Sequence, residues 1–399
     1  MIAISPNNNE IHIYEVSSWT RLFTLTDHDL LVSAIDWSPV NNKIVSCSHD
    51  RNAFVWTYQP ESVEEPAQWK PTLVVLRIDR AAVDVKWSLD GLRFAVASAS
   101  KCVPVCTYES QNDWWVSKMI KKKFKSTVLC CAFHPVNGQV LATGSSDSKC
   151  RIYSTHIPEV DGPEITAWPL VSPLEFGEPY LELKVLGWVN AVAWSPSGNV
   201  LAFAGKQQLT CAIIYQSISY RLVCVTGQDS SLHCTTFYET GPVTTSLRFS
   251  LLPLSSLIFT SERSIVGGGF DFNPVVFGQV PGKDVGSFLL SNLSLIYVYI
   301  GASEWGVLGQ LDEGKKGDEA GAKSGVAAAR DMFKAKASTG QDRRSATLAT
   351  QHDNTIRTLA HCGGLGEESL SYISSSSLDG RLVVWELAQI GVSMAALQL

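Results

Sequence analysis

The sequence of 399 residues predicts an all-β fold, a seven-bladed β-propeller that carries an inserted linker. The first observation is a pair of positions that recurs seven times: a short polar residue and, after five intervening residues, usually an aromatic one. The second is that short alternating strands lie between these pairs. Repeats of about 40 to 50 residues with this content indicate four-stranded blades arranged around an axis. The whole chain, residues 1–399, is therefore expected to form one propeller.

The recurring pair has a physical explanation. Asp or Asn at the start of a tight turn accepts hydrogen bonds from backbone N–H groups two residues further on. Because side chains alternate between the two faces of the next strand, a fixed spacing places the aromatic on the face that packs against the adjacent blade. The clearer pairs are Asn8–Tyr14, Asp50–Trp56, Asp147–Tyr153, Asp271–Phe277 and Asp379–Trp385, and the weaker ones are Ser100–Cys106 and Asp229–Thr235.

Two further strands precede each pair. The first ends in an aromatic residue and a turn, as in "SAIDWSP" (33–39), "VDVKWSLDG" (83–91), "LCCAFHP" (129–135) and "NAVAWSP" (190–196). The second follows that turn, as in "KIVSCS" (43–48). The order strand, turn, strand, turn, strand therefore recurs along the chain.

In the two most regular repeats a His precedes the first strand and completes a set of four residues. A His that donates to the Asp, with the hydroxyl group and the indole N–H, would satisfy these polar groups inside one blade. Ser, His and Asp also form the triad of hydrolases. A catalyst needs one site, whereas this set recurs, so we expect a structural role. The sets are His28, Ser46, Asp50 and Trp56, and His352, Ser374, Asp379 and Trp385.

The first blade departs from the pattern. The chain opens on "IAIS" (2–5), which by register is the second strand of that blade, so the inner strand is lacking. An open ring leaves unpaired strand edges. Either the ring closes in another way or residues are missing from the start of the sequence.

Two apolar segments, residues 205–227 and residues 282–301, interrupt the repeats. Removal of the first would join a strand to a turn as in the other repeats. Both begin with Gly-Lys, which GGTAAG, the usual start of an intron, can encode. We hypothesise that both are translated introns; the alternative is that they are real loop insertions.

Residues 312–345 are rich in Gly, Ala, Lys and Asp and lack a strand pattern, which indicates a linker between blades. Within it, residues 324–337 ("SGVAAARDMFKAKA") can form a helix with Ser324 as the N-cap. A helix of this length is marginal alone in water. The segment is either part of a disordered linker or a helix that orders on a partner through Met332 and Phe333.

The charge distribution limits the classes of partner. A formal net charge of −6 gives no overall electrostatic reason to bind nucleic acid or an acidic membrane. The densest basic run, "IKKKFK" (120–125), is expected to be a solvated edge strand, in which lysines prevent edge pairing. The alternative is a salt-sensitive contact with an acidic protein partner. The lysines of this run are Lys121, Lys122, Lys123 and Lys125.

Several classes of site are not expected. The apolar runs are too short or too interrupted to span a membrane, and the start has no secretory signal. The ten cysteines form no CxxC pairs, which favours reduced thiols and a cytosolic protein. No His or Cys spacing suggests a metal site, so we expect no catalytic, cofactor or metal-binding residues.

The repeats and the linker together resemble the WD40 propeller subunit of the actin-related protein 2/3 complex. The resemblance covers nearly all of the chain apart from the two interrupting segments. It is carried by "IAISPNNNEIHIYE" (2–15), "HDLLVSAIDWSPVNNKIVSCSHDRNAFVW" (28–56), "WVNAVAWSPSGNVLAFAG" (188–205) and "AGAKSGVAAARDMFKAKA" (320–337).

This resemblance implies a non-catalytic scaffold subunit in the cytoplasm and actin cytoskeleton that supports nucleation of branched actin filaments. It implies contacts with other subunits, nucleation-promoting activators and the mother filament. The family's helix between the last two blades is implied to meet actin, here through Arg330, Met332, Phe333 and Lys334. The alternatives are a WD40 scaffold of another assembly, such as a vesicle coat, and a propeller enzyme. The linker argues against the first, and the lack of convergent acidic or nucleophilic residues argues against the second.

Overall fold

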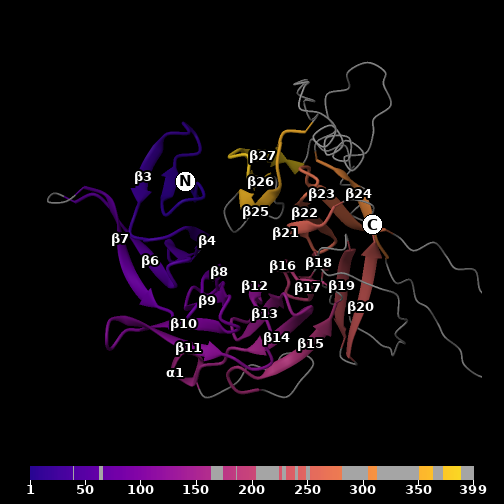
Figure 1. The fold of residues 1–399 in the computed structure, drawn as a ribbon, viewed down its shortest axis with the longest axis horizontal. Coiled ribbons are helices and arrows are strands. Elements are labelled where there is room, and N and C mark those ends of the chain that lie inside the picture. Colours follow the sequence, from indigo (N-terminus) through magenta and orange to yellow (C-terminus); the bar gives the residue numbers. More distant parts are fainter. Residues whose placement is uncertain are drawn as a thin grey trace, which may run out of the picture.

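The computed structural model shows an all-β chain whose strands form seven small sheets around a common axis (Figure 1). Each sheet is a blade, numbered 1 to 7 in chain order. The predicted seven-bladed β-propeller is thereby confirmed. The structure describes residues 1–38, 40–62, 66–162, 174–185, 187–203, 224–226, 231–238, 241–248, 252–280, 304–311, 350–362 and 372–387.

Four blades have four antiparallel strands each. Blade 2 contains β4 (Val32–Trp37), β5 (Lys43–Ser48), β6 (Asn52–Gln59) and β7 (Gln68–Val75). Blade 3 contains β8 (Ala82–Trp87), β9 (Arg93–Ser98), β10 (Val103–Glu109) and β11 (Trp114–Ile120). Blade 4 contains β12 (Val128–Phe133), β13 (Val140–Ser145), β14 (Lys149–Ser154) and β15 (Pro179–Lys184), with helix α1 (Pro158–Asp161) after β14. Blade 6 contains β21 (Leu254–Ser261), β22 (Ser264–Gly269), β23 (Val275–Val280) and β24 (Glu304–Gln310).

In the described residues, the remaining blades have three or five strands. Blade 1 contains β1 (Ile2–Ile4), β2 (Ile11–Tyr14) and β3 (Arg21–Leu25), and blade 7 contains β25 (Ile356–Cys362), β26 (Tyr372–Ser377) and β27 (Leu382–Glu386). Blade 5 contains β16 (Ala191–Trp194), β17 (Val200–Phe203), β18 (Cys224–Thr226), β19 (Ser231–Tyr238) and β20 (Gly241–Arg248). Its additional strand, β18, pairs with β16 and belongs to the interrupting segment 205–227. The rest of that segment, residues 282–301 and the linker 312–345 lie outside the described residues.

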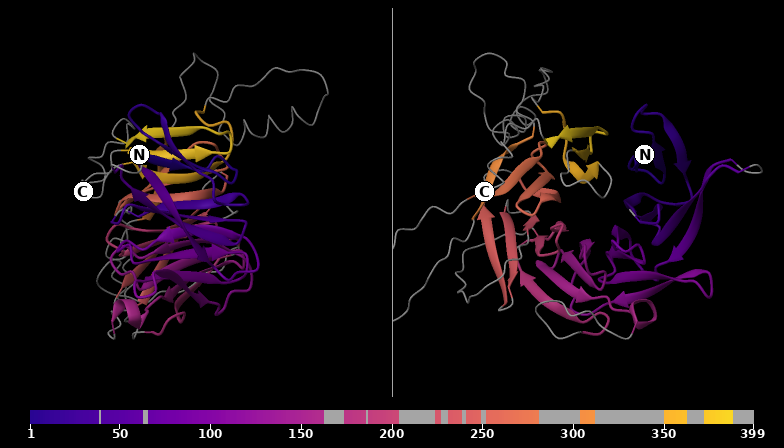
Figure 2. Two further views of the ribbon diagram at one scale, coloured as in Figure 1. Left: turned by 90° about the vertical axis from the view of Figure 1, so that its left-hand side faces the viewer. Right: turned by 180° about the vertical axis from the view of Figure 1, so that it is seen from behind.

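The core is divided among the spaces between neighbouring blades. Six clusters of buried apolar residues join blades 1 and 2, 2 and 3, 3 and 4, 4 and 5, 5 and 6, and 6 and 7. The predicted alternation of side chains produces these clusters. In β6, Val55 packs toward blade 3, whereas the next residue, Trp56, packs toward blade 1. Figure 2 shows the sheets stacked side by side around the axis in this order.

Polar contacts also tie the inner strands together. Asp36 of β4 accepts a hydrogen bond from the backbone N–H of Trp87 in β8 over 2.7 Å. Asp84 of β8 accepts one in the same way from Cys131 in β12 over 3.0 Å. A carboxylate on one blade thus fixes the backbone of the next.

The recurring Asp or Asn accepts the predicted hydrogen bond from the backbone two residues on, and in several blades this residue also accepts a second backbone hydrogen bond. Asn8, Asp50 and Asp379 each accept a hydrogen bond from the backbone N–H two residues on, over 2.8, 2.9 and 2.8 Å. The other carboxylate oxygen of Asp50 accepts from Asp29, in the loop that enters the same blade, over 3.2 Å. Asp147, Asp271 and Asp379 make this second contact with Lys125, Leu252 and Asp353 over 3.0, 2.5 and 2.7 Å. The recurring residue therefore joins two loops at one end of each of these blades.

Cys102, Cys106, Cys130, Cys131 and Cys150 are free and buried, which agrees with the reduced thiols expected from the sequence. Across the described ranges, no helix has the length and apolarity that a membrane crossing requires.

Candidate interaction surface and polar networks

The first predicted polar set forms a continuous chain inside blade 2. His28 Nδ1 lies 2.7 Å from Asp50 Oδ2, and His28 Nε2 lies 2.8 Å from Ser46 Oγ. Trp56 Nε1 donates to the same Ser46 oxygen over 2.9 Å. Because an indole N–H only donates, Ser46 accepts from Trp56 and can give its own proton to His28, while His28 donates to Asp50.

This arrangement has the residue types of a hydrolase triad but lacks an accessible nucleophile. The side chains of His28, Ser46 and Trp56 are buried. The oxygen of Ser46 already has two partners within the blade. The geometry therefore supports the structural role expected from the repetition of the set.

In blade 7 the histidine, serine and tryptophan part of this chain forms, but the predicted serine is wrong. His352 Nε2 lies 2.6 Å from Ser375 Oγ, and Trp385 Nε1 donates to Ser375 Oγ over 2.7 Å. The hydroxyl group of Ser374 instead donates to the backbone carbonyl of Ala360 over 3.4 Å. His352 Nδ1 lies 3.6 Å from Asp379 Oδ2.

The physical reason for this correction is strand alternation. Neighbouring residues of β26 point to opposite faces of the sheet, so only one of two adjacent serines can face both His352 and Trp385. Ser46 lies four residues before Asp50 and ten before Trp56, and Ser375 has the same offsets from Asp379 and Trp385. The spacing in blade 2 was the signal that could have identified Ser375.

Blade 4 uses other chemistry at the same turn. Asp147 forms an ion pair with Arg151, with 2.9 Å between Oδ2 and Nη2, and Arg151 Nε lies 2.9 Å from Glu182 Oε2. The Tyr153 hydroxyl donates to the backbone carbonyl of Lys122 over 2.7 Å. Arginine and two carboxylates thus hold this blade where blades 2 and 7 use histidine, serine and tryptophan.

The predicted basic run lies in the loop between β11 and β12, not in an edge strand. β11 ends at Ile120, so the expectation of a solvated edge strand is wrong. Phe124 is buried in the cluster between blades 3 and 4 and anchors the loop, because an aromatic side chain gains stability from burial. The flanking lysines Lys121, Lys122, Lys123 and Lys125 are exposed. Lys122 forms an ion pair with Glu178.

Other cations lie at the same end of the neighbouring blades. The loop that enters blade 3 contacts the turn between its second and third strands, because Ser100 Oγ accepts from the N–H groups of Asp79 and Arg80 over 3.1 and 2.9 Å. The loop before β12 makes the equivalent contact, since Asp147 accepts from Lys125. We call these exposed residues the basic surface: Arg51, Arg77, Arg80, Lys101, Lys121, Lys123 and Lys125.

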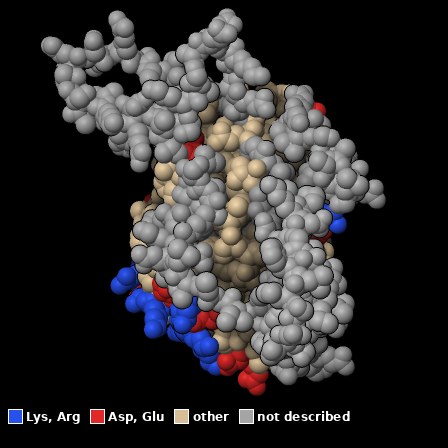
Figure 3. All heavy atoms as spheres, turned by 90° about the vertical axis from the view of Figure 1, so that its right-hand side faces the viewer, with Lys and Arg blue, Asp and Glu red and all other residues tan. Residues whose placement is uncertain are grey.

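The basic surface is a local departure from the acidic charge of the chain. Ser100 hydrogen bonding lowers the pKa of Asp79 from its ordinary value of 3.8, and nearby Arg80 and Arg51 lower it further. Within the described residues, no carboxylate forms an ion pair with the seven cations of this surface. Figure 3 shows Lys and Arg side chains gathered, beside Asp and Glu, at the lower end of the molecule where blades 3 and 4 lie.

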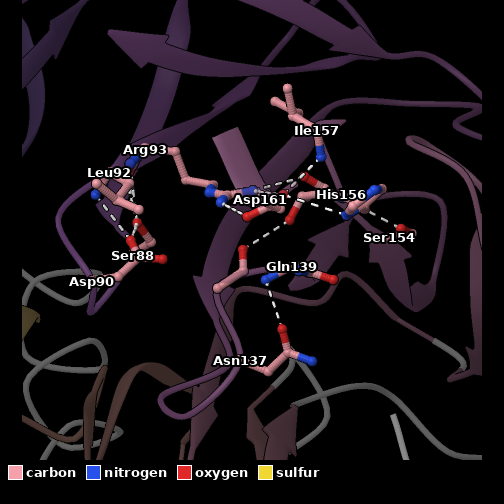
Figure 4. A network of polar contacts seen from close by, with 12 residues as sticks. Ser88, Asp90, Leu92, Arg93, Asn137, Gln139, Ser154, His156, Ile157 and Asp161 are labelled. Atoms are coloured by element: carbon pink, nitrogen blue, oxygen red, sulfur yellow. Dashed lines mark hydrogen bonds and ion pairs between the residues drawn. The ribbon is translucent and has the colours of Figure 1, made fainter. Parts of the chain in front are cut away.

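A buried ion pair between blades 3 and 4 was not predicted from the sequence. Arg93 of β9 donates to both carboxylate oxygens of Asp161 in α1, with 3.0 Å between Nη1 and Oδ2, and to the carbonyl of Thr155 over 2.9 Å. Ile157 also donates its N–H to Asp161 over 2.7 Å, and His156 Nδ1 lies 3.5 Å from the same oxygen (Figure 4). These contacts hold the segment after β14 against the neighbouring blade.

The remaining predicted partner-binding residues, Arg330, Met332, Phe333 and Lys334, lie outside the described residues. Among the described residues, no group of three or more His, Cys, Asp or Glu side chains could hold a metal ion.

Comparison with known proteins agrees with the repeat pattern. The model of the family "WD domain, G-beta repeat" matches residues 19–57 and 118–154. Actin-related protein 2/3 complex subunit 1B of Arabidopsis thaliana is 37% identical over 393 residues, which cover 97% of this chain and 91% of that protein. Actin-related protein 2/3 complex subunit 1 of Schizosaccharomyces pombe is 34% identical, and the match covers 95% of this chain and 92% of that protein. Actin-related protein 2/3 complex subunit 1 of Saccharomyces cerevisiae is 32% identical, and the match covers 94% of this chain and 89% of that protein. This chain therefore belongs to the family of actin-related protein 2/3 complex subunit 1.

Proposed function

We propose that this chain is the propeller subunit of an actin-related protein 2/3 complex, where it acts as a non-catalytic scaffold in the cytoplasmic actin cytoskeleton. The observation that carries this proposal is similarity to curated subunits over 97% of the chain. The burial of the Ser46, His28 and Asp50 side chains supports a scaffold over a hydrolase. In this role the subunit supports nucleation of branched actin filaments.

Affinity purification tests the assembly. A tagged copy of the full chain, expressed in its own cell type, is expected to co-purify with actin-related proteins and the other subunits of the complex. A tag without the chain is the control. If no actin-related protein is enriched above that control, the assignment to the complex is lost.

We further propose that the basic surface binds an acidic segment of a nucleation-promoting activator. Seven exposed cations over neighbouring loops attract an acidic chain over about a Debye length, and such a contact weakens as salt rises. Changing Lys121 and Lys123 to Glu is expected to weaken activator binding and reduce its dependence on salt. The matched control is Lys70→Glu on β7, which reverses an exposed charge away from these loops.

We also propose that the linker contacts the mother filament through a helix over residues 324–337. The supporting observation is the apolar spacing that brings Met332 and Phe333 together, flanked by Arg330 and Lys334. The double change Met332→Ala and Phe333→Ala is expected to impair branching while assembly of the complex stays normal. Lys315→Ala with Lys316→Ala, in the same linker, is the control. Normal branch density with the first variant would count against the helix.

A further inference from the structure

The two ends of the propeller carry different side chains. Because neighbouring strands of a blade are antiparallel, the connections between its first and second strands and between its third and fourth strands lie at one end. The basic surface lies at the opposite end, in the other connections. At the first end, blades 2, 3 and 4 present six apolar or aromatic side chains that are between 41% and 74% exposed, which we call the apolar surface: Val40, Leu89, Leu92, Tyr108, Trp114 and Val136. Exposed apolar side chains that gather on one face mark an interaction site.

Contacts between neighbouring blades fix the turns that carry the apolar surface. Asn41 Nδ2 donates to the backbone carbonyl of Gly91 over 3.0 Å, which joins the turn of blade 2 to that of blade 3. The turn of blade 3 lies against that of blade 4, since a Cβ atom on Gly138 would come within 2.4 Å of Asp90 Oδ2. These three blades are successive sheets around the axis (Figure 1). Their turns therefore form one continuous surface.

The two aromatic residues of the apolar surface are held in place by their own hairpin. The hydroxyl group of Tyr108 donates to Asp113, and Trp114 Nε1 donates to Glu109 over 2.8 Å. Lys43 Nζ, from blade 2, lies 5.5 Å from the centre of the Tyr108 ring. Aromatic side chains that are already fixed lose little conformational freedom on binding, so they are suitable anchors for a partner.

The charge beside the apolar surface is negative. Asp90, Glu109 and Asp113 are exposed, and none of them forms an ion pair within the described part of the chain. The hydrogen bond from Trp114 lowers the pKa of Glu109 from its ordinary value of 4.5, so this group is ionised at neutral pH. Lys and Arg are absent from the sequence of these connections, which are residues 38–42, 88–92, 109–113 and 134–139. A partner with Lys or Arg beside apolar side chains would complement this surface.

We infer that the apolar surface binds a basic amphipathic helix of another subunit of the complex, an inference that rests on the proposed function. The surface consists of turns, so it presents side chains to a partner and not a strand edge. A helix suits such a surface, because it satisfies its own backbone hydrogen bonds and places apolar side chains along one face. Lys or Arg side chains beside that face would meet Asp90, Glu109 and Asp113. The two ends of the propeller can then bind partners of opposite charge at the same time.

Photo-crosslinking in the purified complex tests this inference. The photoreactive residue p-benzoylphenylalanine is introduced in place of Val40 or Val136, and mass spectrometry identifies the captured segment. Both positions are expected to capture the same segment of another subunit, with apolar residues at helical spacing and a net positive charge. No crosslink, a crosslink only to this chain, or a captured segment of net negative charge would overturn the inference.

Variants measure the contribution of the apolar surface to assembly. Val40→Lys with Val136→Lys removes apolar contacts and repels a basic partner, and it is expected to lower recovery of the captured subunit by roughly tenfold or more. The matched control, Leu30→Lys with Leu378→Lys, changes two exposed apolar residues at the opposite end and is expected to leave that recovery unchanged. All four side chains are exposed, so both variants should melt at the temperature of the wild type.

The outcomes separate this inference from the proposed function. If the wild-type chain recovers no actin-related protein, the proposed function fails and this inference falls with it. If the wild-type chain recovers the complex and the Val40→Lys, Val136→Lys variant recovers every subunit equally well, only the assignment of the apolar surface is overturned.

Discussion

The Nδ1 atom of His28 lies 2.7 Å from Oδ2 of Asp50, and this contact joins the loop that enters blade 2 to the turn between its second and third strands. Both side chains are nearly inaccessible to water. Removal of one partner from a buried hydrogen bond to a charged group destabilises the fold, because the other partner stays buried without a hydrogen bond.

Replacement of Asp50 tests the strength of this junction. Asp50→Ala removes the partner of His28 and of two backbone N–H groups. We expect the free energy of unfolding to fall by about 3 kcal/mol, measured by chemical denaturation. Asp27→Ala, an exposed neighbour, should change it by less than about 0.5 kcal/mol. Equal small effects would show that the network contributes little.

The two serines of β26 offer a direct test of register. Ser375→Ala leaves the Trp385 N–H and the His352 ring without their common partner, and we expect a loss of about 2 kcal/mol in unfolding free energy. Ser374→Ala removes one weak bond of 3.4 Å to a carbonyl, and we expect a loss below about 1 kcal/mol. A larger loss for Ser374→Ala would refute the assignment of Ser375.

Asp379 gives blade 7 a dependence on acid pH. Burial acts to raise the pKa of this carboxyl group, but hydrogen bonds from the backbone of Arg381 and Asp353, with His352 nearby, hold it below 3.8. Its contribution to stability is therefore fully present above about pH 4 and lost as the pH falls through the lowered value.

Measurement of the melting temperature between pH 7 and pH 3 tests this contribution of Asp379 to stability. Asp379→Asn, which cannot ionise, should melt lower than the wild type at pH 7, and the two curves should converge at the acid end. Parallel curves over the whole range would remove Asp379 from the acid response.

The ion pair between Arg93 and Asp161 predicts a strong coupling between blades 3 and 4. Either Arg93→Ala or Asp161→Ala leaves an unpaired buried charge, which costs about 3 to 5 kcal/mol. The double variant should be less destabilised than the sum of the two, because no charge remains unpaired. Additive losses in a double-mutant cycle would show that the two groups act independently.

Much of this architecture could be predicted from local pattern. The spacing from Asp50 to Trp56 follows from turn chemistry and from strand alternation, both of which act over a few residues, so repetition alone indicated seven blades. The set of His28, Ser46, Asp50 and Trp56 could be predicted for the same reason. In blade 7 the choice of Ser374 failed because the two serines are alike in chemistry and differ only in the face they occupy.

By itself, then, the sequence determined the blade as a unit, the number of its copies and the polar set within blade 2, because these depend on short-range periodicity. Only the tertiary structure decided that Arg93 meets Asp161 across two blades, 68 residues apart, and which cations lie together on neighbouring loops. Those relationships depend on how one sheet is rotated against the next. Packing between blades sets that rotation, and no local pattern encodes this packing.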